Sequence, residues 1–174
     1  MQTCIPSYVD NYQSGLVEER INKLLSILNS CTLCPHECHT NRLNGEKGIC
    51  QAGEKVTVSS AFPHFGEEPP LVGRRGSGTI FFANCNLRCE FCQNHDISHR
   101  NNGNEVTLER LAELMLYLQG LGCLNINFVT PTHYATQIVQ ALSIAVEMGL
   151  NVPLVWNCSG YDSLEVITLL DGIV

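Results

Sequence analysis

The chain has 174 residues, 44% of them hydrophobic and 16% charged, a composition that suits a globular protein of one or two domains. Ten Lys and Arg against 17 Asp and Glu give a net charge of -7, which disfavours a nucleic acid or an anionic membrane as the main partner. The N-terminus has no signal-peptide pattern, and no apolar segment approaches the ~18 residues that span a bilayer, so we expect a cytoplasmic protein.

The first elements along the chain are a helix, a cysteine-rich segment and a linker. Residues 14–29 are predicted to be helical because apolar residues recur at helical spacing: Leu16, Ile21, Leu24, Leu25 and Leu28. Residues 31–50 are rich in cysteine and show little periodicity. Residues 62–78 hold three prolines and four glycines, which is typical of an irregular segment. We therefore predict an N-terminal helix and cysteine-rich segment over residues 1–60, a linker over 61–78 and a core over 79–174.

Strands and helices alternate in the core. Strands are expected at residues 79–83, 124–129 and 152–156, and helices at 108–119, 133–148 and 163–170. This alternation predicts an α/β fold with a parallel sheet, open or barrel-like. A fourth strand is expected to begin at residues 172–174, where the chain ends. The pattern predicts the N-terminal half of a partial (β/α) barrel with three βα units, either a fragment or an unusually short half-barrel.

Cys85, Cys89 and Cys92 form a C-x3-C-x2-C motif just after the first of these strands. Loops that follow the strands form the active face of βα barrels. Three thiolates so close in sequence can bind three corners of one iron–sulfur cubane and leave its fourth iron open. The alternative is a zinc site, which would need a fourth ligand such as His95.

This motif, with the aromatic Phe91 before the last cysteine, resembles the signature of the radical S-adenosylmethionine (SAM) superfamily. Residues 76–82 (GSGTIFF) and 85–94 (CNLRCEFCQN) are similar to the branch related to pyruvate formate-lyase activating enzymes. Residues 31–38 (CTLCPHEC) and 128–133 (FVTPTH) are similar to uncharacterised members of that branch. The resemblance covers about residues 31–174.

The resemblance implies a 4Fe-4S cluster whose open iron binds the amino and carboxylate groups of SAM. Reductive cleavage of SAM would give methionine and a 5′-deoxyadenosyl radical, which abstracts hydrogen from a substrate. In activating enzymes that substrate is a backbone glycine of a partner enzyme. The implied partners are SAM, an electron donor and, for an activating enzyme, a protein substrate.

The resemblance also suggests SAM-binding positions. Phe91 would pack beside the adenine, or simply within its loop. Many relatives carry Gly-Gly-Glu after the second strand for the SAM amino group, but this sequence has residues 127–133 (NFVTPTH) instead. Thr130 or Thr132 would then supply acceptors, although Thr132 is also a candidate cap of the next helix. Asn157 and Ser159 match a polar stretch that meets the ribose, or they form a turn.

A second group comprises four cysteines: Cys31, Cys34, Cys38 and Cys50. Four thiolates suit a closed zinc site or a second iron–sulfur cluster, and the alternative is unliganded thiols packed in a small domain. His36 and His39 are alternative ligands or exposed side chains.

Several other residues receive a simpler interpretation. Cys123 and Cys158 are expected to be small buried side chains, and Cys4 an incidental terminal residue. Arg75 would hold an anionic cofactor or lie in a solvated loop. His133 would face the active site or begin a helix.

Two rival functions stay open from the sequence. One is a metal-binding or electron-transfer module without radical chemistry, which would not bind SAM. The other is an inactive truncated product, which would expose a sheet edge and apolar helix faces.

Overall fold

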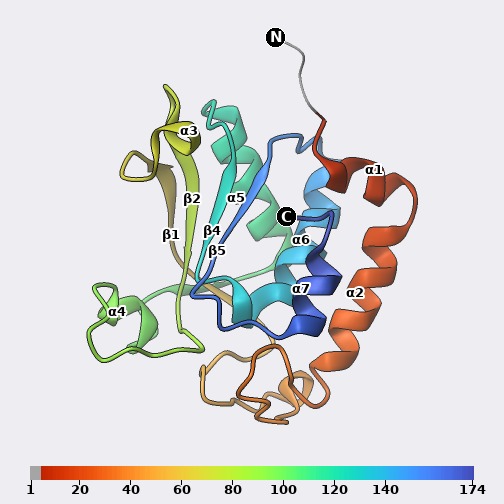
Figure 1. Cartoon of the computed structure of the whole chain (residues 1–174), viewed down its shortest axis with the longest axis vertical. Coiled ribbons are helices and arrows are strands. Elements are labelled where there is room, and N and C mark those ends of the chain that lie inside the picture. The colour runs from red at the N-terminus through yellow and green to blue at the C-terminus, as the bar shows by residue number, and fades with distance from the viewer. Residues whose placement is uncertain (1–4) are drawn as a thin grey trace.

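A five-stranded mixed sheet forms the centre of the molecule in the computed structural model, which describes residues 5–174 (Figure 1). The strand order is β3-β1-β2-β4-β5. The parallel part comprises β2 (Ser77–Phe82), β4 (Ile126–Val129) and β5 (Leu154–Asn157). β1 (Val56–His64) runs antiparallel to β2 and to β3 (Asn104–Val106). Cys4 lies outside the described residues.

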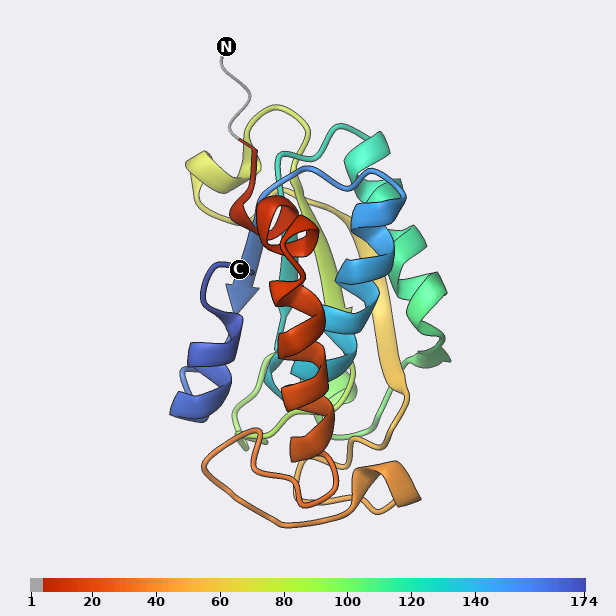
Figure 2. The same ribbon diagram turned by 90° about the vertical axis from the view of Figure 1, so that its right-hand side faces the viewer.

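Helices lie along one side of this sheet. α5 (Leu108–Gly120) and α6 (Ala135–Glu147) pack against each other, and α5 also contacts strands β1, β2 and β4. α2 (Leu16–Ile27) packs on α6 and on α7 (Leu164–Leu170), with α1 (Ser7–Gln13) beside it (Figure 2). The short elements are η1 (Arg42–Asn44), α3 (Pro69–Val72), α4 (His95–Ser98) and η2 (Thr132–Tyr134). No helix in residues 5–174 is long and apolar enough to cross a membrane.

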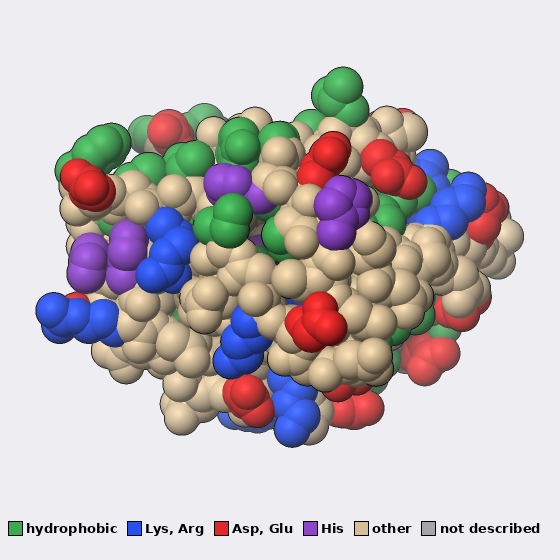
Figure 3. Space-filling view, turned by 90° about the horizontal axis from the view of Figure 1, so that it is seen from below, with side chains coloured by type: hydrophobic (Ala, Val, Ile, Leu, Met, Phe, Trp, Pro, Cys, Tyr) green, Lys and Arg blue, Asp and Glu red, His purple; other side chains and the backbone are tan. Residues whose placement is uncertain are grey.

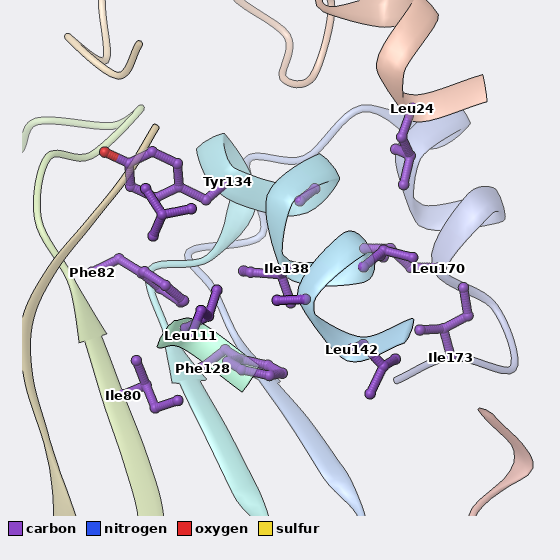
Figure 4. Packing of buried hydrophobic residues seen from close by; sticks show 14 of the residues in the cluster. Leu24, Ile80, Phe82, Leu111, Phe128, Tyr134, Ile138, Leu142, Leu170 and Ile173 are labelled. Carbon is purple, nitrogen blue, oxygen red and sulfur yellow. The ribbon is translucent and has the colours of Figure 1, made fainter. Parts of the chain in front are cut away.

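The hydrophobic core fills the space between the sheet and the helices. Ile80 and Phe82 of β2 and Phe128 of β4 point toward α5 and α6 (Figure 4). The helices contribute Leu111, Ile138 and Leu142, all fully buried. Burial of such side chains contributes about 1.5–3 kcal/mol each, so this layer fixes the orientation of the strands.

The opposite face of the sheet carries polar side chains as well as apolar ones. Because side chains alternate along a strand, Thr79, Asn127 and Val155 lie in one row on that face, in register across β2, β4 and β5. Phe62 and Phe81 stack there at 5.7 Å and are partly exposed. In a βα barrel this face points inward.

The predicted α/β class is confirmed and the sheet is open, one of the two forms expected, but it is mixed where a parallel sheet was predicted. Residues expected to be an irregular linker contain the end of β1 and the short helix α3. Pro63 obscured this strand in the sequence. It is tolerated because β3 pairs only with residues 56–58, which leaves that side of β1 unpaired at Pro63. The division of the chain into domains stays a prediction.

The predicted fourth strand was also wrong. Residues 171–173 form a turn, and Gly172 has a φ of 74°. Its carbonyl accepts hydrogen bonds from Ser7 Oγ at 3.0 Å and Asn11 Nδ2 at 2.8 Å, so α1 holds this end of the chain. The helix predicted over residues 14–29 is observed as α2, which begins at Leu16 because Gly15 has a φ of 82°, and the separate helix α1 before it was not predicted.

Candidate functional site

Loops that follow three parallel strands meet at one edge of the sheet. The cysteine loop follows β2, Thr130 follows β4 and Asn157 ends β5. Thr130 N donates a hydrogen bond to Asn157 O at 2.9 Å, which ties two of these loops together. The fold thus brings the motif and two candidate SAM-binding segments to the same edge.

Asn84 fixes the point where the chain leaves β2. Its φ of 69° is a left-handed conformation that asparagine tolerates better than most residues. Its backbone N donates to Ile97 O at 2.9 Å, and its buried side-chain amide donates to Tyr134 Oη at 3.2 Å and Asn101 Oδ1 at 3.0 Å. The start of the cysteine loop is therefore held from three directions. No pattern in the sequence indicated this role of Asn84.

Cys85, Cys89 and Cys92 are free, partly buried thiols on this loop. Leu87 N donates to Cys85 Sγ at 3.3 Å and Ser98 Oγ donates to Cys92 Sγ at 3.4 Å. Cys85 and Cys92 line a cavity of about 50 Å³, together with Thr130; Cys89 does not line it. Within residues 5–174, no three Cys, His, Asp or Glu side chains converge in the geometry of a bound metal ion.

The donor chemistry nevertheless fits an iron–sulfur cluster. Three unpaired thiols on one loop are the ligand type that such clusters take. His95, the candidate fourth ligand of a zinc site, is exposed and stacks on His99 at 4.2 Å. The arrangement favours three sulfur ligands over a closed four-ligand zinc site.

The three candidate SAM-binding residues lie at the surface. Phe91 is 92% exposed between the second and third cysteines. Asn157, the last residue of β5, and Ser159, just after it, are also exposed. Their side chains are accessible to a ligand at this edge. Their roles stay predictions.

Thr132 does not cap the helix, contrary to the sequence-based expectation. It is the first residue of η2, and its hydroxyl donates to Asp162 Oδ1 at 2.7 Å. Trp156 Nε1 also donates to this oxygen, at 3.4 Å. Asp162 is buried and its Oδ2 has no partner among the described residues. The sequence did not indicate Asp162, because its partners lie up to 30 residues away.

His133 is buried behind the cysteine loop. Its Nε2 lies 2.9 Å from Ala83 O, at the end of β2, and its Nδ1 has no partner in the described part of the chain. Burial lowers the pKa of His133 to about 4, with a further contribution from Arg42, while the bond to Ala83 opposes the shift. His133 is therefore a neutral structural donor.

Arg75 is not placed to hold a cofactor at this edge. It is exposed, precedes β2 and lies near Gly122, at the opposite end of the sheet from the cysteine loop. Cys123 is buried as expected, and Cys158 is half-buried.

The four cysteines of the second group lie around one small cavity. Cys31, Cys34, Cys38 and Cys50 line one cavity of about 10 Å³. Burial raises the pKa of Cys34 and of Cys50. For Cys38, burial is outweighed by hydrogen bonds, first from Thr40, and its pKa is lowered. His36 faces the same cavity, whereas His39 is exposed and bonds Ser30 Oγ at 3.0 Å.

The two cysteine groups are neighbours. His36 Nε2 lies 2.8 Å from Asn86 O, and the buried Asn86 amide donates to Tyr161 O at 2.7 Å. The rings of His36 and Tyr161 meet edge to face at 5.0 Å. The end of the molecule seen in Figure 3 carries basic, acidic and histidine side chains side by side, so charges of both signs are mixed over this surface.

Comparison with known proteins adds two findings. The sequence profile of the radical SAM superfamily matches residues 79–172. A protein of Methanocaldococcus jannaschii, described as uncharacterized, is 34% identical over 169 residues, which cover 92% of this chain and 47% of that protein. The chain thus spans about half the length of this curated relative. No solved structure matches the chain.

Proposed function

Because the chain belongs to the radical SAM superfamily, whose members carry out SAM-dependent radical chemistry, we propose that Cys85, Cys89 and Cys92 bind its 4Fe-4S cluster. The observation that carries the proposal is the position of these three free thiols. They lie inside the matched region and at the edge where the parallel strands end. Three ligands leave one iron of a cubane without a protein ligand.

The loop residues position and tune the thiolates. Asn84 anchors the loop to Tyr134, so Cys85 starts from a fixed backbone. The N–H of Leu87 and the hydroxyl of Ser98 donate to sulfur, which stabilises the negative charge of the thiolates and raises the cluster's reduction potential. Removing either donor should shift the potential without removing a ligand.

The chemistry supplied by the bound cluster and SAM is reductive cleavage to methionine and a 5′-deoxyadenosyl radical, for hydrogen abstraction from a substrate. Phe91 would cover the adenine, and Asn157 and Ser159 would bond the ribose. Thr130, on the wall of the cavity beside Cys85 and Cys92, would offer a polar contact near the cluster. The resemblance to activating enzymes supports glycyl-radical activation of a partner protein as the specific role.

The test is SAM cleavage by the anaerobically reconstituted chain. We expect about four iron and four sulfide per chain and, with dithionite, formation of 5′-deoxyadenosine detected by chromatography. Cys89→Ala should abolish the product, whereas Cys123→Ala, at a buried cysteine outside both cysteine groups, should retain it. A cluster that forms but never cleaves SAM would refute the enzyme and favour an electron-transfer module.

A further inference from the structure

Arg42 presents a buried positive charge without a carboxylate. Its side chain is 1% exposed, and its guanidinium donates to Gly53 O at 2.6 Å and His133 O at 2.6 Å. These partners are neutral carbonyls, and no ion pair of Arg42 with Asp or Glu occurs within residues 5–174. A buried charge is costly unless an opposite charge faces it.

The groups that face Arg42 are thiols. Arg42 lines the same small cavity as Cys31, Cys34, Cys38 and Cys50, and it interacts electrostatically with Cys50. Cys34 interacts in turn with Cys31 and Cys38. The buried cation therefore lines the same cavity as four cysteine side chains.

Backbone groups two residues further on act against burial at three of these sulfurs: His36 at Cys34, Thr40 at Cys38 and Ala52 at Cys50. Burial still outweighs them at Cys34 and Cys50, whose pKa is raised. Such bonds favour the charged form of an acceptor. The same pattern holds at Cys85, which accepts from Leu87.

Local strain accompanies this arrangement. Glu37 and His39, on either side of Cys38, have φ of 41° and 53°, and Gln51, after Cys50, has φ of 61°. Each such conformation costs on the order of 1 kcal/mol and persists only where the surroundings impose it. A Cβ added at Gly48 would clash with Cys38 Sγ, so glycine at this position leaves room for the sulfur.

We propose that Cys31, Cys34, Cys38 and Cys50 bind a single divalent metal ion, of the zinc type, in a closed tetrathiolate site. Four thiolates around a divalent ion carry a net charge of two minus, which supplies the missing partner of Arg42. The cavity of about 10 Å³ is the size of roughly one water-sized sphere, which suits one ion enclosed by four ligands.

The site also braces the neighbouring loop. Cys34 contacts the Asn86 side chain, and His36 bonds the Asn86 backbone, directly after Cys85. A metal ion bound by the four thiols would therefore hold the start of the loop that carries Cys85 in place. This consequence rests on the proposed function of Cys85, whereas metal binding by the four thiols does not.

The experiment separates the two sites with the variant Cys85→Ala/Cys89→Ala/Cys92→Ala, purified anaerobically. We expect about one zinc per chain by elemental analysis and no iron above background. Apo protein titrated with Co²⁺ should give the thiolate charge-transfer and d–d bands of a tetrahedral site, with one equivalent at saturation. No bound metal, or about four iron and four sulfide per chain in this variant, would overturn the proposal.

Matched variants test the individual contributions. Arg42→Met should weaken zinc affinity by about tenfold or more, and Gly48→Ala should also weaken it. The control is Gly120→Ala, whose Cβ would meet nothing within 4 Å and which should leave zinc affinity unchanged. Cys38→Ser should lose the cobalt thiolate bands and Cys123→Ser should keep them. If circular dichroism shows that Cys38→Ser does not fold, the cobalt titration of the chain with Cys31, Cys34, Cys38 and Cys50 intact still decides whether the site binds metal. Equal zinc affinity of Arg42→Met and wild type would refute the role of Arg42. Failure of SAM cleavage alone would leave each of these readouts unchanged.

Discussion

His36 Nε2 lies 2.8 Å from the backbone oxygen of Asn86, so the N-terminal cysteine segment is bonded directly to the loop that carries Cys85, Cys89 and Cys92. Fifty residues separate the two partners in sequence. The Asn86 side chain extends the connection to Tyr161, beyond β5. One buried asparagine thus joins three segments at the functional edge of the sheet.

Asn86→Ala should destabilise the fold and loosen the cysteine loop. It leaves the Tyr161 carbonyl without its donor, a loss that costs about 1–3 kcal/mol in the free energy of unfolding. Urea denaturation measures this cost. Asn22→Ala, at an exposed position of α2, is the control and should change stability by less than about 0.5 kcal/mol. Equal stability of the two variants would contradict the joining role of Asn86.

Asn127→Val should stabilise the protein. The Asn127 side chain is fully buried on β4, and neither of its amide atoms has a partner within residues 5–174. Replacing it with a β-branched apolar residue removes a desolvation cost of about 1–3 kcal/mol.

The matched control for this prediction is Asn125→Val. Asn125 accepts from Ser77 Oγ at 2.6 Å and donates to Leu71 O at 2.8 Å, so its loss should destabilise the fold by a similar amount. Thermal denaturation of both variants gives the comparison. The account of Asn127 would be wrong if both midpoints fell.

Leu111→Ala tests the packing of α5 on the sheet. Leu111 is fully buried in the core, and deleting such a side chain costs about 2–5 kcal/mol. Leu164→Ala, on a side chain that is 83% exposed, should cost less than about 1 kcal/mol. Chemical denaturation with both variants checks the difference, which should exceed about 1 kcal/mol.

His133 should make stability depend on pH. Its folded pKa of about 4 lies below the ordinary value of 6.5, so the unfolded chain binds a proton that the folded chain does not in this window. The free energy of unfolding should therefore fall as pH drops from about 7 to about 5, by roughly 2 kcal/mol from this group. His133→Gln keeps a neutral donor for Ala83 and should flatten that part of the profile. Parallel profiles for variant and wild type would contradict a buried neutral His133.

Periodicity was a good guide to the parallel half of the fold. The strands β2, β4 and β5 and the helices α5, α6 and α7 were predicted within a few residues, because buried apolar residues repeat clearly there. The antiparallel strand β1 was missed, since Pro63 and a register shift between Val58 and Ser60 break its pattern. The turn at Gly172 was mistaken for a strand because buried Ile173 looks like a strand residue in isolation.

The site was predictable where local spacing carries the chemistry. The two cysteine groups stand out by spacing alone. Arg42, Asn86 and Asp162 do not, because their partners are distant in sequence: Arg42 reaches His133 across 91 residues. Only the folded chain shows that the two groups of thiols are adjacent.

The decisive measurement for the open iron is electron paramagnetic resonance of the reduced, anaerobically reconstituted chain, with and without SAM. We expect a cluster signal that changes when SAM is added, since three thiolates leave an iron open to it, and that is lost in Cys89→Ala. A cluster signal that SAM does not change would refute SAM binding at that iron.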